Sequence, residues 1–257
     1  MHPSFSVPKS LLAALTLLLP AVPGLTAEGD DATLARRLAA ERPIAARPSP
    51  WLEELTWMEV RDAIAAGTTT VIVPTGGIEE NGPFLATGKH DYILEATCPV
   101  LAAKLGNALC APIVKFVPEG DIDPPTGAMR FPGTLSLRPE TYEALLEDLA
   151  ASLKQAGFTD VVLLGDSGGN QRGMANVAER LNARWAEEPT RVHFVREFYD
   201  PGWEATEQFT ARELGVEETR NDGHHDDIWV TAMMMVVDPR HVRYEERVAA
   251  GLASING

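Results

Sequence analysis

Apolar positions recur with two different spacings along the chain, and the change of spacing predicts strands and helices in turn. Short apolar runs rich in β-branched residues at 69–73 and 161–164 are typical of buried parallel strands. Stretches with a helical period predict helices at residues 56–66, 92–105, 141–156 and 174–185. Further strands are expected at 111–117 and 191–198, and the late apolar run at 231–237, with three consecutive methionines, is expected to be core strand.

Strands that alternate with helices indicate an α/β layered fold, and the sequence contains no internal repeat. Residues 51–257 are predicted to form a single domain, because a chain of this length can bury one large core. An arm rich in Ala, Arg and Pro at residues 28–50 precedes that domain, and a short helix is expected within it around 34–41.

The first 27 residues have the pattern of a secretory signal peptide. Lys9 precedes an apolar run at residues 11–22, and small residues follow as far as Ala27. That run is shorter than the stretch of about 20 apolar residues that spans a bilayer. We therefore expect a cleaved signal and an exported protein, periplasmic or secreted, with no membrane association after cleavage. An uncleaved membrane anchor is the alternative.

Charge and cysteine content narrow the possible partners. The chain has 22 Lys and Arg against 37 Asp and Glu, which gives a formal net charge of −15. Nucleic acid is excluded as a partner, because binding phosphates needs a surplus of basic residues. An oxidising compartment would permit a Cys98–Cys110 bridge, and two buried free thiols are the alternative. Neither state of the cysteines implies a catalytic role.

Three polar loops hold the candidate chemistry. Two of them, at residues 75–91 and 165–170, directly follow predicted strands, and the third lies at 221–227. Open α/β sheets bind ligands at the carboxyl ends of their strands. Three of the six histidines lie in these loops, namely His90, His224 and His225, and several carboxylates lie beside them. Converging imidazoles and carboxylates suit a divalent metal, although a solvated loop with capping carboxylates is the simpler reading of any one loop.

Residues 165–169 read GDSGG, which resembles the nucleophile signature of chymotrypsin-type serine proteases. Those enzymes are all-β barrels, whereas this pentapeptide lies between an apolar strand and a helix. The segment is better interpreted as a glycine-rich turn at which the backbone approaches a ligand, with Asp166 or Ser167 at the site.

Four motifs follow one another along the chain. They are PTGGIEENGP at 74–83, FPGTLSL at 131–137, GFTDVVLLGDSGGN at 157–170 and DGHHDD at 222–227. Together they resemble the creatininase (creatinine amidohydrolase) family over about residues 57–237. The resemblance implies a three-layer α/β/α sandwich with a mostly parallel central sheet. It also implies a two-metal site, usually zinc or manganese, hydrolysis of amide or cyclic amide C–N bonds, and homo-oligomers that are often hexameric.

The match to the family is incomplete at the expected site. Glu79 matches a metal ligand, whereas Asn81 and Ser167 stand where the family has histidine ligands. His90 stands at the position of a bridging aspartate. Either Asp91 bridges with one residue inserted, or His90 replaces a missing imidazole.

The late motif keeps its first histidine as His224 and shortens its final carboxylate to Asp227. From these matches we predict the following metal ligands: Glu79, His90, Asp91, Asp166 and His225. The predicted catalytic groups are His224, Asp227 and Glu80. The predicted substrate contacts are Asn81, Ser167, Asn170 and Trp229.

We therefore expect a divalent metal, one or two ions of zinc or manganese, that activates a water to hydrolyse a small non-peptide amide or cyclic amide. Two alternatives stay open. Loss of the two histidine ligands would leave a protein that binds a small ligand without turnover. A structural metal in an interaction protein would have no open coordination position.

Overall fold

The computed structural model describes residues 27–200, 202–215 and 225–251. The chain divides into two units, residues 1–43 and residues 44–257. The described part of the first unit contains the helix α1 (Ala27–Ala39), which begins earlier than the helix expected around 34–41. Apart from Ala27, the predicted signal peptide lies outside the described residues. Among the described helices, none combines the length and the apolar character needed to cross a membrane.

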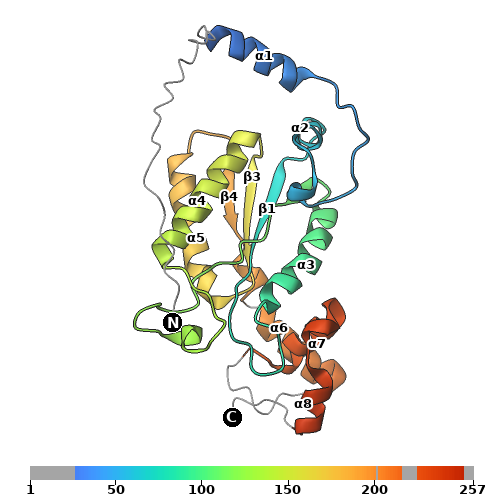
Figure 1. Ribbon diagram of the computed structural model, residues 1–257, viewed down its shortest axis with the longest axis vertical. Helices are drawn as coiled ribbons and strands as arrows, with labels where there is room; N and C mark the ends of the chain where they lie inside the picture. The colour runs from blue at the N-terminus through green and yellow to red at the C-terminus, as the bar shows by residue number, and fades with distance from the viewer. Residues whose placement is uncertain (1–26, 201, 216–224, 252–257) are drawn as a thin grey trace, which may run out of the picture. The chain divides into compact units, whose positions relative to one another are not determined.

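A parallel sheet of four strands lies at the centre of the second unit (Figure 1). In the spatial order β2-β1-β3-β4, its strands are β2 (Ala108–Cys110), β1 (Thr70–Thr75), β3 (Asp160–Gly165) and β4 (Arg191–Phe194). β1 and β3 pair along their whole length, and Thr75 lies opposite Gly165. The residues that follow these two strands therefore start side by side at one edge of the sheet.

Two strand predictions differ from the structure. The strand expected at 111–117 is wrong: β2 lies before it and ends at Cys110, and the expected range contains only isolated bridges at Val114 and Val117. The strand expected at 191–198 ends at Phe194, and a 3-10 helix (Arg196–Phe198) follows it.

The late apolar run is a helix rather than the expected core strand. It forms α7 (Ile228–Val237), and the side chain of Asp227 caps its N-terminus by accepting a hydrogen bond from the Val230 amide at 2.8 Å. Met234 is fully buried, whereas Val236 is 86% exposed. Residues two apart share a face in a strand and point in nearly opposite directions in a helix, so this exposure pattern is that of a helix.

Helices cover both faces of the sheet. The helices α4 (Pro139–Ala156) and α5 (Gly168–Arg184) cover one face, and α3 (Lys89–Leu105) covers the other (Figure 1). The helix α2 (Trp57–Ala65) packs against the same apolar core as α4 and α5. Alternate residues of β1 divide between two apolar cores: Val71 and Val73 face α4 and α5, and Ile72 faces α3. The predicted three-layer α/β fold is therefore confirmed.

The C-terminal helices are α6 (Gly202–Phe209), which continues into a π-helical turn (Thr210–Leu214), α7 and α8 (Tyr244–Ala250). A third apolar core joins α7 to α3, where Val230 and Met234 pack with Ile93. This packing brings the loop before α7 to the first turn of α3. Short 3-10 helices complete the described elements at Leu52–Glu54, Gly127–Arg130 and Pro239–His241.

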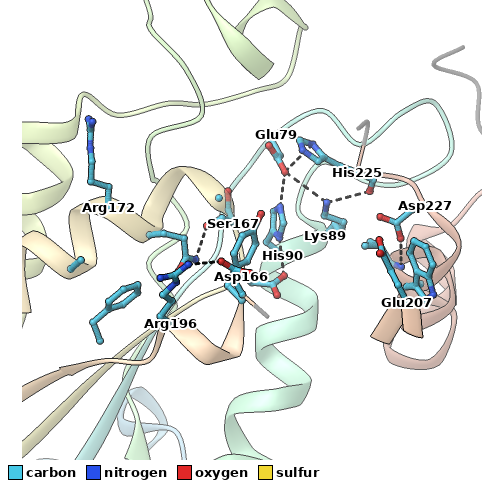
Figure 2. Close-up of a pocket in the computed structure, with 18 residues that line it drawn as sticks. Glu79, Lys89, His90, Asp166, Ser167, Arg172, Arg196, Glu207, His225 and Asp227 are labelled. Atoms are coloured by element: carbon cyan, nitrogen blue, oxygen red, sulfur yellow. Dashed lines mark hydrogen bonds and ion pairs between the residues drawn. The ribbon is translucent and has the colours of Figure 1, made fainter. Parts of the chain in front are cut away.

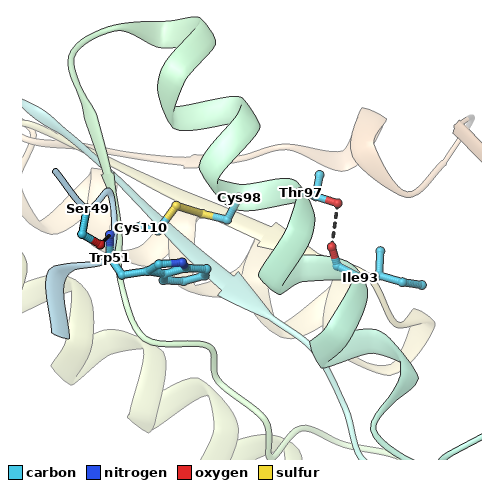
Figure 3. The surroundings of a disulfide bond; sticks show 6 residues. All are labelled: Ser49, Trp51, Ile93, Thr97, Cys98 and Cys110. Atoms are coloured by element: carbon cyan, nitrogen blue, oxygen red, sulfur yellow. Dashed lines mark hydrogen bonds between the residues drawn. A yellow bond between two sulfur atoms is a disulfide. The ribbon is translucent and has the colours of Figure 1, made fainter. Parts of the chain in front are cut away.

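A disulfide bond joins Cys98 of α3 to Cys110 of β2 (Figure 3). Both cysteines are fully buried, and their Cα atoms lie 6.2 Å apart. The Cys110 amide also donates a hydrogen bond to the carbonyl of Pro50 at 2.7 Å. The bridge therefore ties the helix on one face of the sheet to its edge strand, and it decides between the two states of the cysteines that the sequence left open.

Candidate active site

The candidate site lies at the carboxyl edge of the sheet, where three segments meet. The loop after β1 carries Glu79 and leads into α3, whose first turn carries Lys89 and His90. Asp166 directly follows β3. The loop before α7 contributes His225, which has a φ of 58°, a left-handed conformation that is uncommon for a residue with a side chain.

His90 is held between two carboxylates (Figure 2). Its Nδ1 is hydrogen-bonded to Asp166 Oδ2 at 2.8 Å, and its Nε2 to Glu79 Oε1 at 2.6 Å. All three side chains are buried, at 7% exposure or less. This row of carboxylate, imidazole and carboxylate is the centre of the site.

The charges around Glu79 and His90 stabilise each other. Burial raises the pKa of Glu79, but the hydrogen bond from His90 and the positive charges nearby outweigh it and lower the pKa to about 2. Burial and the charge of Lys89 lower the pKa of His90, but the hydrogen bonds to Asp166 and Glu79 outweigh them and raise it. Glu79 is therefore an anion, and the two carboxylates favour a proton on His90 in the metal-free protein.

Two further nitrogens approach the same oxygen of Glu79. Lys89 Nζ lies 3.7 Å from Glu79 Oε1, and His225 Nδ1 lies 3.2 Å from it. Burial, together with the charge of Lys89, lowers the pKa of His225 and favours its neutral imidazole. Glu79 Oε1 is thus the point on which two imidazoles and one ammonium converge.

Glu119 belongs to this cluster, and the sequence analysis missed it. It accepts a hydrogen bond from Ser167 Oγ, at 3.1 Å to one carboxylate oxygen and 3.3 Å to the other. Burial and the charge of Glu79 raise the pKa of Glu119 to about 8, so it holds a proton at neutral pH. A signal was present in the sequence, because Glu119 comes two residues after the end of the strand predicted at 111–117.

The predicted site residues separate into two groups. Those that line one cavity are Glu79, His90, Asp166, Ser167, His225, Asp227 and Trp229. Those outside its lining are Glu80, Asn81, Asp91 and Asn170. His224 lies outside the described residues.

The second group supports the loops around the cavity. The Asn81 amide donates to the carbonyls of Glu79 and Ala86, both at 3.0 Å, and the Asn170 amide donates to the carbonyl of Thr75 at 2.9 Å. Glu80 Oε2 accepts a hydrogen bond from the Gly82 amide at 3.1 Å. These contacts fix the course of the backbone through the first polar loop.

Asp91 lies behind the loop rather than in the cavity. Its Oδ1 accepts a hydrogen bond from the Gly77 amide at 3.4 Å, and Lys115 lies 4.0 Å from its other oxygen. Burial raises the pKa of Asp91 to about 6. The sequence left His90 and Asp91 as alternatives for a metal ligand. Of the two, His90 is the one that faces Glu79.

The cavity has a volume of about 700 Å³, which is within the usual range for small-molecule sites. Aromatic side chains form part of its wall, namely Phe194, Tyr199 and Trp229. Arg172 and Arg196 lie on one side of the central row, and Glu207 and Asp227 lie on the other (Figure 2). The sequence analysis did not single out the two arginines, Tyr199 or Glu207, because they come from α5, α6 and the turn after β4 rather than from the three polar loops.

The donor chemistry suits one divalent ion. Within the described residues, no three His, Cys, Asp or Glu side chains are already arranged as a metal site. Two imidazoles and one carboxylate nevertheless converge at Glu79 Oε1, and that donor set is one that catalytic zinc uses. Asp166 on Nδ1 of His90 also matches the carboxylate that typically orients a ligating histidine.

Comparison with known proteins identifies relatives of this chain. A family model for creatinine amidohydrolase (Creatininase) matches residues 53–254. A creatinine amidohydrolase from Pseudomonas putida is 28% identical over 116 residues, which span 45% of this chain and 44% of that protein. The chain therefore aligns with less than half of this curated relative.

Solved creatininase structures have the same fold. One in an Mn form is 22% identical with a TM-score of 0.63, and a variant of Zn–Zn type is 22% identical with a TM-score of 0.62. Each similarity covers 77% of this chain and 76% of the other. With most of its length matched by the family model, this chain belongs to the creatininase family.

Proposed function

We propose that this protein hydrolyses a small non-peptide amide or cyclic amide in the cavity around Glu79, His90 and Asp166, with one bound ion of zinc or manganese. The observation that carries the proposal is the buried row in which His90 bridges the two carboxylates at the base of a cavity of about 700 Å³. Family membership supports the reaction class, and the Mn and Zn–Zn forms of solved relatives support the metal.

The residues that would hold the ion are Glu79, His90 and His225. When bound, the ion supplies positive charge that polarises an amide carbonyl and lowers the pKa of water. Asp166 keeps the His90 ring oriented so that Nε2 faces Glu79.

The proton transfers of the reaction need a further group. Asp227 is the carboxylate of the late loop that lines the cavity. It would accept a proton from the attacking water as the water oxygen bonds to the carbonyl carbon. The C–N bond then breaks, and the proton passes to the leaving nitrogen.

A second candidate function is binding without turnover, and one observation favours it. Asn81 and Ser167 stand where the family resemblance places histidine ligands, and both are engaged within the protein instead. A cavity with these replacements would hold a small molecule without the full set of ligands.

Hydrolysis of a panel of small cyclic and linear amides by the metal-loaded protein separates the two functions. We expect turnover in the wild type and a loss in Glu79→Gln greater than the about 10- to 100-fold that is typical of removing an outer partner. Asp166→Asn should lose about 10- to 100-fold. Glu140→Gln, an exposed change on α4, is the matched control. Saturable binding of an amide with no turnover would favour the second function.

We further propose that the mature protein is exported and forms homo-oligomers. The buried Cys98–Cys110 bridge supports an oxidising compartment. Apolar side chains that are exposed on α7 and α8, Val236 and Val248, support a subunit contact. N-terminal sequencing of the secreted or periplasmic protein, and light scattering after size-exclusion chromatography, test these two points.

A further inference from the structure

Lys89 is a buried lysine that lines the cavity beside Glu79. Its side chain is 2% exposed, and its Nζ lies 3.7 Å from Glu79 Oε1. It also donates a hydrogen bond to the carbonyl oxygen of His225 at 3.2 Å (Figure 2). Lysines are rarely buried to this extent without a partner or a function. The amide hydrolysis described above assigns no role to it.

The contacts of Lys89 leave part of its ammonium group available. An ammonium group has three N–H donors. Within the part of the chain that the structure describes, its polar partners are the His225 carbonyl and the Glu79 carboxylate. Because Lys89 also lines the cavity, the remaining donor is available to a bound molecule.

The position of Lys89 also limits how much positive charge the cavity can accept. Glu79 Oε1 already faces the ammonium group of Lys89 and the ring of His90. Burial lowers the pKa of Lys89, whereas the carboxylates of Glu79 and Asp166 raise it and favour the ammonium form. A divalent ion at Glu79 would meet the repulsion of this ammonium group within a few ångströms, in an interior that screens charges poorly. A second ion would meet the repulsion of both the first ion and Lys89.

We propose that Lys89 restricts the site to a single divalent ion and binds the carbonyl oxygen of the substrate through its free N–H. The carbonyl role rests on the proposed amide hydrolysis, whereas the limit of one ion does not. Negative charge develops on the carbonyl oxygen as water adds to the carbon. A cation that is already held in place by the His225 carbonyl and Glu79 stabilises that charge without reorganising.

The number and affinity of bound ions test whether Lys89 restricts the site to a single divalent ion. Protein stripped with a chelator is titrated with Zn²⁺ by calorimetry, and metal per chain is measured after dialysis. We expect one ion in the wild type, and binding at least tenfold tighter in Lys89→Met, because the repulsion is removed. Lys89→Arg keeps the charge and should match the wild type. Lys104→Met, an exposed change on the same helix, is the control. Two ions per wild-type chain, or unchanged or weaker binding in Lys89→Met, would overturn the limit of one ion.

Steady-state kinetics on an amide that the wild type hydrolyses test whether Lys89 binds the carbonyl oxygen of the substrate. Lys89→Met should lower kcat by about 10²- to 10³-fold, the usual loss for one donor to a developing oxyanion, and change KM less than threefold. Lys89→Arg should recover part of kcat. A kcat within threefold of the wild type in Lys89→Met would overturn the carbonyl role. Wild-type protein that hydrolyses no amide would overturn the proposed function together with the carbonyl role, and the ion count would still decide the other half.

Discussion

The buried ion pair between Arg247 and Asp226 is expected to hold the late loop against the site. Arg247 Nη1 lies 3.0 Å from Asp226 Oδ2, and the two side chains are 9% and 2% exposed. Arg247 also lies over the ring of Phe84, at 5.8 Å from its centroid. Asp226 stands between His225 and Asp227, which both line the cavity.

Arg247→Met removes one partner of this pair and leaves a buried carboxylate without its cation. Breaking a buried pair in this way costs about 3 to 5 kcal/mol. For a chain of this size, each kcal/mol lowers the melting temperature by about 2 to 4 °C, so we expect a decrease of roughly 6 to 20 °C. We also expect weaker metal binding, because His225 loses the anchor of its neighbour.

Thermal unfolding followed by circular dichroism measures the effect. Arg240→Met is the matched control, because Arg240 also pairs with an aspartate but is 84% exposed, and its loss should change the melting temperature little. Burial raises the pKa of Asp226 even with Arg247 present. In Arg247→Met, a proton on Asp226 removes the unpaired buried charge. The decrease in melting temperature relative to the wild type should therefore be smaller at about pH 5 than at about pH 8. Equal losses in the two arginine variants, or a deficit that grows on acidification, would refute the reasoning.

Three further changes probe the disulfide, a close approach and a titrating carboxyl group. Replacing Cys98 and Cys110 by serine should cost about 3 kcal/mol in denaturant unfolding, the value expected for a loop of this length, and an unchanged midpoint would contradict it. Gly76→Ala places a Cβ against Asp91 Oδ1 and should cost about 1 to 3 kcal/mol, so wild-type stability would argue against this packing. Burial raises the pKa of Glu119 to about 8, so the stability of the metal-free protein should fall as pH rises towards 8. Glu119→Gln should make this fall smaller, because His90 and Asp91, whose pKa values are also raised, remain. A fall of the same size in the variant would exclude Glu119 as a source.

The alternating pattern of strands and helices was predictable because it depends on local periodicity. The runs at 69–73 and 161–164 correspond closely to β1 and β3, whose residues are apolar towards both helical layers. The run at 231–237 was wrongly assigned, because a short apolar segment has no polar positions from which a period can be read. Its helical state depends on the Asp227 cap and on packing against α3.

The site was predictable in part for a similar reason. Glu79, His90 and Asp166 come from loops directly linked to β1 and β3, and the register of a parallel sheet brings such loops together. The roles of His90 and Asp91 were not separable in sequence. Successive residues of a helix point about 100° apart, so only the placement of α3 decides which of them faces Glu79.

The sequence by itself determined the α/β class, the loops that carry the site and the family, because each depends on local patterns or on short motifs. The tertiary structure alone decided that Lys89 is buried beside Glu79, that Glu119 joins the site, and that Cys98 meets Cys110. Each of these depends on how α3, the sheet and the segments packed around them meet. The physical reason is that burial and charge pairing are set by neighbours distant in the chain, and no local period encodes them.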